Sequence, residues 1–169
     1  MPGDWRHLGR RFFSALRAGP LNESETASLT ALLDPAEMAL FVEQPRIDQR
    51  HGLESMMFAA ERTGDQDVLR AATLHDIGKR HAGLGVPGRV LASICLKLRI
   101  PVRGRFRMYR DHGPIGAAEL QRIGSPQITV EYARHHHGHR PGSVPEHTWS
   151  LLSEADDSTE RRVRVRVER

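Results

Sequence analysis

An all-α fold is predicted by three features of the sequence. Apolar residues recur at three- and four-residue spacing in most segments. Glycines and prolines separate these segments, and capping residues stand where several of them begin. Alternating apolar and polar residues, the pattern of a half-buried strand, stand out only in the tail, at residues 163–167. We therefore expect a compact helical bundle without internal repeats or an inner linker.

The N-terminal part of the chain predicts four successive helices. Residues 4–18 carry apolar side chains at helical spacing and end at a Gly-Pro pair. A capping-type sequence predicts that a second helix opens near Ser24. Pro35 is placed to begin a short third helix that ends at Pro45, since proline is favoured in the first turn. A fourth helix is predicted over residues 46–63.

The central segments are interrupted more often. A fifth helix is predicted over residues 67–77, and the glycines and proline of residues 83–88 predict a loop after it. Apolar spacing then predicts a helix through residues 90–98. Because a proline and a glycine break the pattern in residues 100–110, we expect a loop or lid there.

The C-terminal part predicts three more helices. Residues 114–123 have mixed helical spacing, and a Ser-Pro pair at residues 125–126 predicts an N-terminus that launches a helix into the histidine run. The last predicted helix covers residues 148–157.

Length and composition favour one intracellular domain. A chain of 169 residues can bury a substantial core. Its single cysteine excludes an internal disulfide framework and is typical of a reducing compartment. No segment approaches the roughly 20 apolar residues that span a membrane, and the first residues lack the apolar centre of a signal peptide. We expect a cytoplasmic protein without a membrane span.

Positive charge is concentrated in two places, although the net charge is only +4. Residues 97–110 contain six basic residues and no acidic one, and residues 161–169 form a second basic cluster. Basic patches attract phosphate-bearing partners, whether small substrates, nucleic acid or lipid headgroups. A solvated basic surface is the simpler interpretation of either cluster.

Several histidines and aspartates fall inside or at the rim of predicted helices. Singly, each has a plain explanation, as a core histidine, a helix cap or an exposed acid. Jointly, imidazoles and carboxylates in apolar surroundings can converge on a transition metal, because a buried charge needs a partner. The residues concerned are His51, His75, Asp76, His112, His135, His136, His137 and Asp156.

The order of these residues resembles the HD-domain superfamily of metal-dependent phosphohydrolases. The motifs are HDIGK at residues 75–79 with an upstream histidine, HGPIGAAEL from His112, the run in YARHHHG, and LLSEADD near the end. The resemblance implies a compact HD-domain helical bundle at residues 50–158. Residues 1–49 are then accessory helices packed on this core, and residues 159–169 are a basic tail that we expect to be flexible.

The resemblance also implies a ligand set. In members with one ion the ligands correspond to His51, His75, Asp76 and Asp156. In members with two ions, Asp76 bridges while His112 and the histidine run hold the second ion, and both extra elements are present here. We therefore expect one or two divalent ions, with two favoured, of Mn, Fe, Co or Zn.

The histidine run leaves two assignments open. Helical spacing from Ile128 and Tyr132 favours His135 and His136 as the inward pair. Similarity to the HHE motif of HD-GYP members favours His136 and His137, which we adopt. The glutamate of that motif is a glycine here and the GYP signature is missing. We therefore do not expect hydrolysis of cyclic dinucleotides, and the chain looks more like a stand-alone HD hydrolase.

The implied activity is hydrolysis of a phosphate ester of a nucleotide or other small phosphorylated substrate by metal-activated water. Asp76 and Lys79 are the expected catalytic residues, and the residues expected to bind the substrate phosphate are Lys79, Arg103, Arg105 and Arg107. The alternatives are a di-iron HD-fold oxygenase and a non-catalytic nucleotide- or nucleic-acid-binding module. Nucleic acid is not the favoured partner, and a homodimer remains open.

Overall fold

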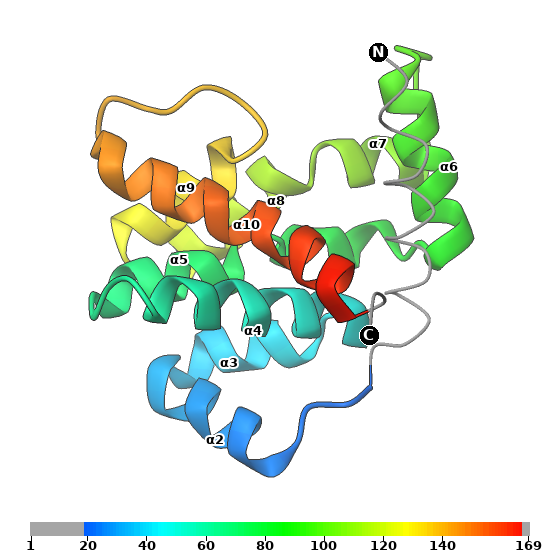
Figure 1. Ribbon diagram of the computed structural model, residues 1–169. Helices are drawn as coiled ribbons and strands as arrows, with labels where there is room; N and C mark the ends of the chain where they lie inside the picture. Colours follow the sequence, from blue (N-terminus) through cyan, green and yellow to red (C-terminus); the bar gives the residue numbers. More distant parts are fainter. Residues whose placement is uncertain (1–18, 167–169) are drawn as a thin grey trace.

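The computed structural model describes residues 19–166 of the chain, with side chains for residues 19–157. All the secondary-structure elements assigned within this part are helices, which confirms the predicted all-α class (Figure 1). The helix predicted over residues 4–18 lies outside the described residues. The elements in order are α2 (Glu23–Leu32), α3 (Pro35–Val42), α4 (Arg46–Ala60), α5 (Gln66–Leu74), the 3-10 helix η1 (Ile77–Ala82), α6 (Val86–Lys97), α7 (Gly104–Arg110), α8 (His112–Arg122), α9 (Gln127–His135) and α10 (Glu146–Arg166).

Local sequence signals explain where several helices begin. Asn22 caps α2 through a capping box with Glu25, and the Asp65 side chain accepts the backbone N–H groups at the start of α5. Pro35 occupies the first turn of α3, as predicted. These caps satisfy backbone donors that a helix start leaves unpaired.

The largest departures from the prediction lie in four segments. The helix predicted over residues 67–77 ends at Leu74, and η1 follows from Ile77. Helix α6 begins at Val86, inside the predicted loop, because Pro87 lies in its first turn, where a missing N–H is tolerated. Residues 104–110 form α7 instead of a loop or lid, since Gly104 begins the helix with a positive φ of 54°. Helix α10 continues to Arg166, so the backbone of the alternating tail is helical up to that residue.

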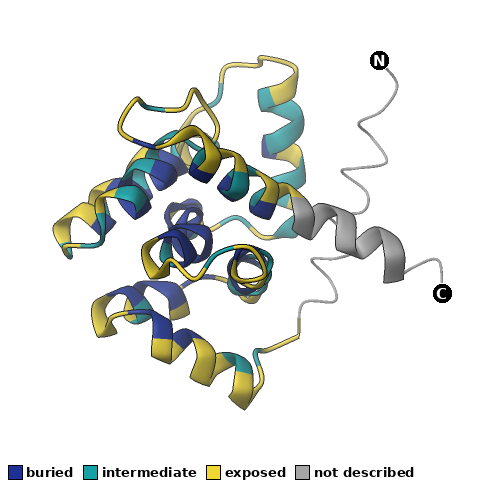
Figure 2. Ribbon diagram, turned by 60° about the vertical axis from the view of Figure 1, so that its left-hand side comes forward, coloured by how far each residue is buried: buried dark blue, intermediate teal, exposed yellow. Residues whose placement is uncertain are grey.

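The core lies where α2, α3, α4, α5, α8, α9 and α10 pack on one another. Its largest fully buried side chains include Phe41, Leu53, Leu74, Tyr132 and Leu152. Figure 2 shows these helices with buried inner faces, whereas α6 and α7 are mainly intermediate or exposed. None of the described helices is long and apolar enough to cross a membrane. The bundle therefore has a dense centre and one loosely covered hairpin, α6–α7.

Candidate metal centre

The residues predicted to bind metal come from separate helices and meet in two adjacent clusters that share Asp76. Helix α4 supplies His51, and His75 and Asp76 follow α5 directly. Helix α8 begins at His112 and α10 contains Asp156. The last two, His136 and His137, follow the end of α9. Buried packing of five elements thus brings together residues that lie up to 105 positions apart.

The first cluster contains His51, His75, Asp76 and Asp156. The Nε2 atom of His51 lies 3.0 Å from Asp156 Oδ1 and 3.2 Å from His75 Nε2. Asp76 Oδ2 lies 3.6 Å from His51 Nε2 and 3.5 Å from His75 Nε2. Four potential ligand atoms therefore surround one small volume.

The second cluster contains Asp76, His112, His136 and His137. The other carboxylate oxygen of Asp76, Oδ1, lies 3.1 Å from His112 Nε2 and 3.4 Å from His136 Nε2. His112 Nε2 lies 3.3 Å from His136 Nε2 and 3.2 Å from His137 Nε2. Asp76 consequently presents one oxygen to each cluster.

Backbone carbonyls fix the orientation of three of the imidazoles. The Nδ1 atoms of His75, His112 and His136 lie 3.0, 2.6 and 2.9 Å from the carbonyl oxygen three residues earlier in the chain. Since that carbonyl only accepts, Nδ1–H donates to it, and Nε2 is the ring nitrogen that faces the cluster. This is the arrangement in which proteins present histidine to a metal.

The donor set and its spacing fit divalent transition ions. Ligands about 2.0–2.2 Å from one ion are separated from their neighbours by roughly 3.0–3.5 Å, as simple polyhedral geometry requires. The neighbouring donor atoms of both clusters lie 3.0–3.6 Å apart. Imidazole and carboxylate together suit Mn, Fe, Co or Zn. Both clusters could therefore hold such an ion.

The first cluster is strongly charged. Burial lowers the pKa of His75, but the carboxylates of Asp76 and Asp156 outweigh it and raise this pKa to about 9. Burial opposes ionisation of Asp76, yet Lys79 and His75 hold its pKa well below the usual range. Burial also opposes ionisation of Asp156, yet the imidazoles of His75 and His51 hold its pKa well below the usual range. Both carboxylates are thus ionised and attract a cation.

The second cluster has less charge. Burial lowers the pKa of His136, and partial burial together with the neighbouring His136 and His112 lowers the pKa of His137 to about 3. Both rings are therefore neutral at physiological pH, which leaves a lone pair free for a ligand bond.

Lys79 lies beside the shared carboxylate. It is buried, it sits in η1 one turn after Asp76, and its Nζ donates a hydrogen bond to Asp76 Oδ2. The sequence prediction of a functional lysine at this centre therefore agrees with its position, whereas its chemical role stays a prediction.

The three arginines expected to bind substrate lie in or next to α7, outside both clusters. Arg103 precedes α7, Arg105 Nε donates to the carbonyl of Ala82 at 2.8 Å, and Arg107 pairs with Asp111. Helix α7 packs against η1, so these arginines flank the element that carries Lys79. Their binding of substrate remains a prediction.

The histidine run resolves into one outward and two inward side chains. The side chain of His135 is 39 % exposed and lies 3.8 Å from Glu131, away from the clusters. His136 and His137 face His112 instead. The buried residues of α9 are Thr129, Val130, Tyr132 and Ala133, so Ile128 lies at the edge of its inner face. Extrapolation that included Ile128 therefore favoured His135 over His137.

Sequence reasoning missed the glycines that let the ligand-bearing helices approach. A Cβ on Gly78 would lie 2.0 Å from the carbonyl oxygen of His112 and 2.7 Å from the Gly116 nitrogen. A Cβ on Gly52 would lie 2.5 Å from the carbonyl oxygen of Thr73. Glycine therefore sets the distance of η1 from α8 and of α4 from α5. A glycine inside a helical pattern, within three residues after a histidine, was the available signal.

Sequence reasoning also missed two buried side chains that lie close to the ligand residues. Tyr132 is buried with its ring centroid 5.8 Å from that of His75 and 5.9 Å from that of His136, so it packs between the two clusters. Buried Asp48, one turn before His51, forms hydrogen bonds of 2.5 and 2.7 Å with Arg89 of α6.

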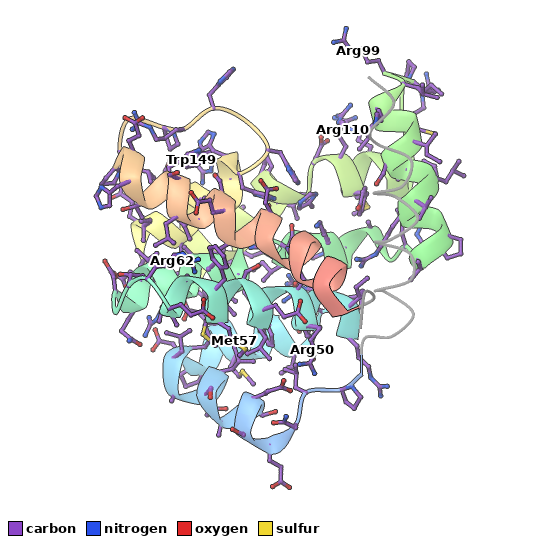
Figure 3. All side chains as sticks on the ribbon, in the orientation of Figure 1. Arg50, Met57, Arg62, Arg99, Arg110 and Trp149 are labelled. Carbon is purple, nitrogen blue, oxygen red and sulfur yellow. The ribbon has the colours of Figure 1, made fainter. Side chains whose placement is uncertain are left out.

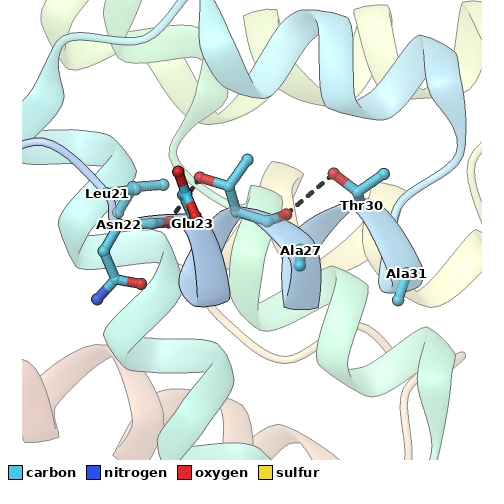
Figure 4. A pocket seen from close by; sticks show the side chains of 7 residues that line it. Leu21, Asn22, Glu23, Ala27, Thr30 and Ala31 are labelled. Carbon is cyan, nitrogen blue, oxygen red and sulfur yellow. Dashed lines mark hydrogen bonds between the residues drawn. The ribbon is translucent and has the colours of Figure 1, made fainter.

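A separate shallow groove runs along α2 (Figure 4). The hydroxyls of Thr26 and Thr30 donate to carbonyls four residues earlier, and the other lining side chains offer little chemistry. We find no site there.

Comparisons with known proteins agree with this geometry. The HD domain family profile matches residues 49–166, which include all the residues of both clusters. Comparisons with curated proteins and with solved structures found no significant match. The HD domain indicates a superfamily of metal-dependent hydrolases that bind divalent metals. Since the profile covers more than half of the sequence, the chain belongs to the HD-domain superfamily.

Proposed function

We propose that this chain is a phosphohydrolase that uses two divalent ions to cleave a phosphate ester of a nucleotide or other small phosphorylated molecule. The observation that carries the proposal is the position of Asp76, whose two oxygens face different clusters. A carboxylate shared in this way suits a pair of ions that act on one substrate.

The residues that would hold the first ion are His51, His75, Asp76 and Asp156, and those for the second are Asp76, His112, His136 and His137. Divalent ions at such a centre make water nucleophilic near neutral pH and offset negative charge on the phosphoryl oxygens. The chain keeps the Nδ1 protons of three imidazoles on backbone carbonyls, so that each ring stays turned toward the centre.

Lys79 would bind the substrate phosphate. Its ammonium group lies against Asp76 and is buried, so a phosphate oxygen that reaches the centre finds a desolvated positive charge. Charge-assisted hydrogen bonds of this kind are roughly twice as strong as neutral ones. The arginines beside α7 would then contact the remainder of the substrate.

Elemental analysis and phosphate release on the same preparation test the proposal. The purified protein, reconstituted with Mn²⁺, Fe²⁺, Co²⁺ or Zn²⁺, is screened against nucleotides and simple phosphate esters. We expect about two equivalents of metal and phosphate release, and loss of both in Asp76→Ala. Lys79→Met should retain the metal but raise the KM for the substrate. His135→Gln is the matched control, because it removes a histidine of the run that faces away.

Two outcomes would contradict the proposal. Iron with oxygen consumption and without phosphate release would assign the centre to a di-iron oxygenase. Absence of metal after reconstitution, with nucleotide binding intact, would leave a non-catalytic binding module.

A further inference from the structure

The end of the α6–α7 hairpin lies far from any core. We call residues 97–103, the segment KLRIPVR that joins the two helices, the hairpin tip. Helix α6 contains a single buried residue, Ala92, and α7 contains none. Figures 1 and 3 show the hairpin at the side of the bundle with Arg99 at its outer end. The tip therefore projects from the side of the bundle.

Aliphatic side chains are exposed on this projection. The exposed fractions are 59 % for Leu98 and 48 % for Ile100, and Leu91, two helical turns before Leu98 on the same face, is 52 % exposed. The other large exposed apolar residues of the bundle include Val42 and Met57, which lie on different helices. Adjacent exposed aliphatic residues mark an interaction surface more strongly than scattered ones.

Basic residues accompany these aliphatic ones. Residues 97–103 contain three lysines or arginines and no aspartate or glutamate. Arg99 and Arg103 of the tip are exposed. The tip therefore combines positive charge with exposed aliphatic side chains that can be buried in an apolar environment.

One arginine of the tip occupies a strained position. Arg99 has a φ of 55°, the one positive φ of a residue other than glycine among the described residues. Hydrogen bonds from the N–H groups of Arg99 and Ile100 to Leu96 and Cys95 form a Schellman motif, whose left-handed residue is usually glycine. Helix α8 ends in the same motif and has glycine there, Gly124, with a φ of 80°. An arginine at the same position of α6 therefore costs stability, and such costs are typical of functional sites.

Charge restricts what can cover the tip. A second copy of the chain that met the tip with its own tip would bring two basic surfaces together. Such a pair would be repelled. Single-stranded nucleic acid would need aromatic side chains for stacking, and the tip contains none. A bilayer surface with anionic headgroups matches both the charge and the exposed aliphatic residues.

We propose that the hairpin tip binds anionic lipid bilayers at their surface, with Leu98 and Ile100 inserted below the headgroups and Arg99 against the phosphates. This binding is independent of the metal centre, since no residue of either cluster belongs to the tip. It would bring the metal centre to a membrane surface.

Vesicle flotation of the full-length protein tests the proposal. We expect binding to vesicles of phosphatidylcholine mixed with phosphatidylglycerol, weaker binding at high NaCl, and none to phosphatidylcholine alone. The double variant Leu98→Asp/Ile100→Asp should lower the partition coefficient by more than about tenfold. Val42→Asp, which places the same charge at an equally exposed apolar site on α3, should leave it unchanged.

Arg99→Gly separates the role of the arginine from its strain. We expect the Tm to rise by about 2 °C, because glycine accepts the left-handed position, while the partition coefficient falls about fivefold, the contribution of one basic residue at an anionic surface. Arg122→Ala, which removes an exposed arginine from α8, should change the partition coefficient little.

Three results would overturn the proposal. The first is absence of flotation with either vesicle, and the second is flotation that the double variant does not weaken. The third is a dimer in solution that this variant converts to a monomer, because a second copy would then cover the tip.

Discussion

The two clusters around Asp76 are built from similar residues but differ in charge. The first combines two imidazoles with two carboxylates, and the pKa of its His75 is raised to about 9. The second combines three imidazoles with one oxygen of Asp76, and the pKa of its His137 is lowered to about 3. The first cluster therefore offers two carboxylates to a divalent ion, which must displace the proton of His75, whereas the second depends on neutral lone pairs and on the shared carboxylate. We expect the first to bind its ion more tightly.

Replacing the shared residue should have the largest effect. Asp76→Ala removes a ligand from both clusters, and we expect both ions to be lost and phosphate release to fall by more than about a thousandfold, since even outer-shell changes cost 10–100-fold. Asp76→Asn keeps one oxygen and should retain at most one ion. Metal content measured after dialysis distinguishes the two variants, and full metal content in Asp76→Ala would refute the shared role.

Removing the second carboxylate of the first cluster should have the next largest effect. Asp156→Asn leaves His51 and His75 facing one ionised carboxylate, so the tighter ion should be weakened by more than about 100-fold. The second ion should remain. Titration of the metal-free protein with Zn²⁺ would then show one site where the unaltered chain shows two. If the weaker site disappeared instead, the order of affinities that we infer would be reversed.

The sequence predicted the fold class and the family correctly, but it did not predict where every helix begins. Helical periodicity and the HDIGK motif depend on neighbours in the chain, and both led to the correct class and family. Pro87 and Gly104 were interpreted as breaks because those residue types usually interrupt helices. In the structure each lies in the first turn of a helix, where the same properties are harmless.

The missed parts of the site depend on which helices touch. The need for glycine at Gly52 and Gly78 arises from backbone atoms of Thr73 and His112, and no local pattern identifies those partners. The choice of His137 over His135 likewise depends on which face of α9 packs on the bundle. The ligand residues that belong to a sequence motif could therefore be predicted, whereas the contacts between helices that position them could not.

Adding a single methyl group at Gly78 should weaken metal binding at the second cluster and leave the first cluster unaffected. Gly78→Ala forces η1 away from α8, because its Cβ would lie 2.0 Å from the carbonyl oxygen of His112. We expect the free energy of unfolding to fall by about 2 kcal/mol and the second ion to be weakened about tenfold, while the first cluster stays intact. Calorimetry and Zn²⁺ titration measure the two effects.

Gly64→Ala is the matched control for this change. Its Cβ would meet nothing within 4 Å, so the same substitution should leave both stability and metal binding within error. Equal effects in the two variants would mean that loss of glycine flexibility, and not the approach of η1 to α8, explains the result.

The smallest effect is expected at the solvent side of the second cluster. His137 is the most exposed of its members, and unlike His112 and His136 it has no carbonyl partner three residues earlier among the described hydrogen bonds. A ligand held less rigidly contributes less, because ordering it on binding costs entropy. His137→Gln should therefore weaken the second ion only about fivefold, whereas His136→Gln, which removes a ring held by Ala133, should weaken it by more than about 30-fold. If a Zn²⁺ titration showed equal losses of affinity in the two variants, a hydrogen bond from the imidazole to the backbone would not determine how much each histidine contributes to metal binding.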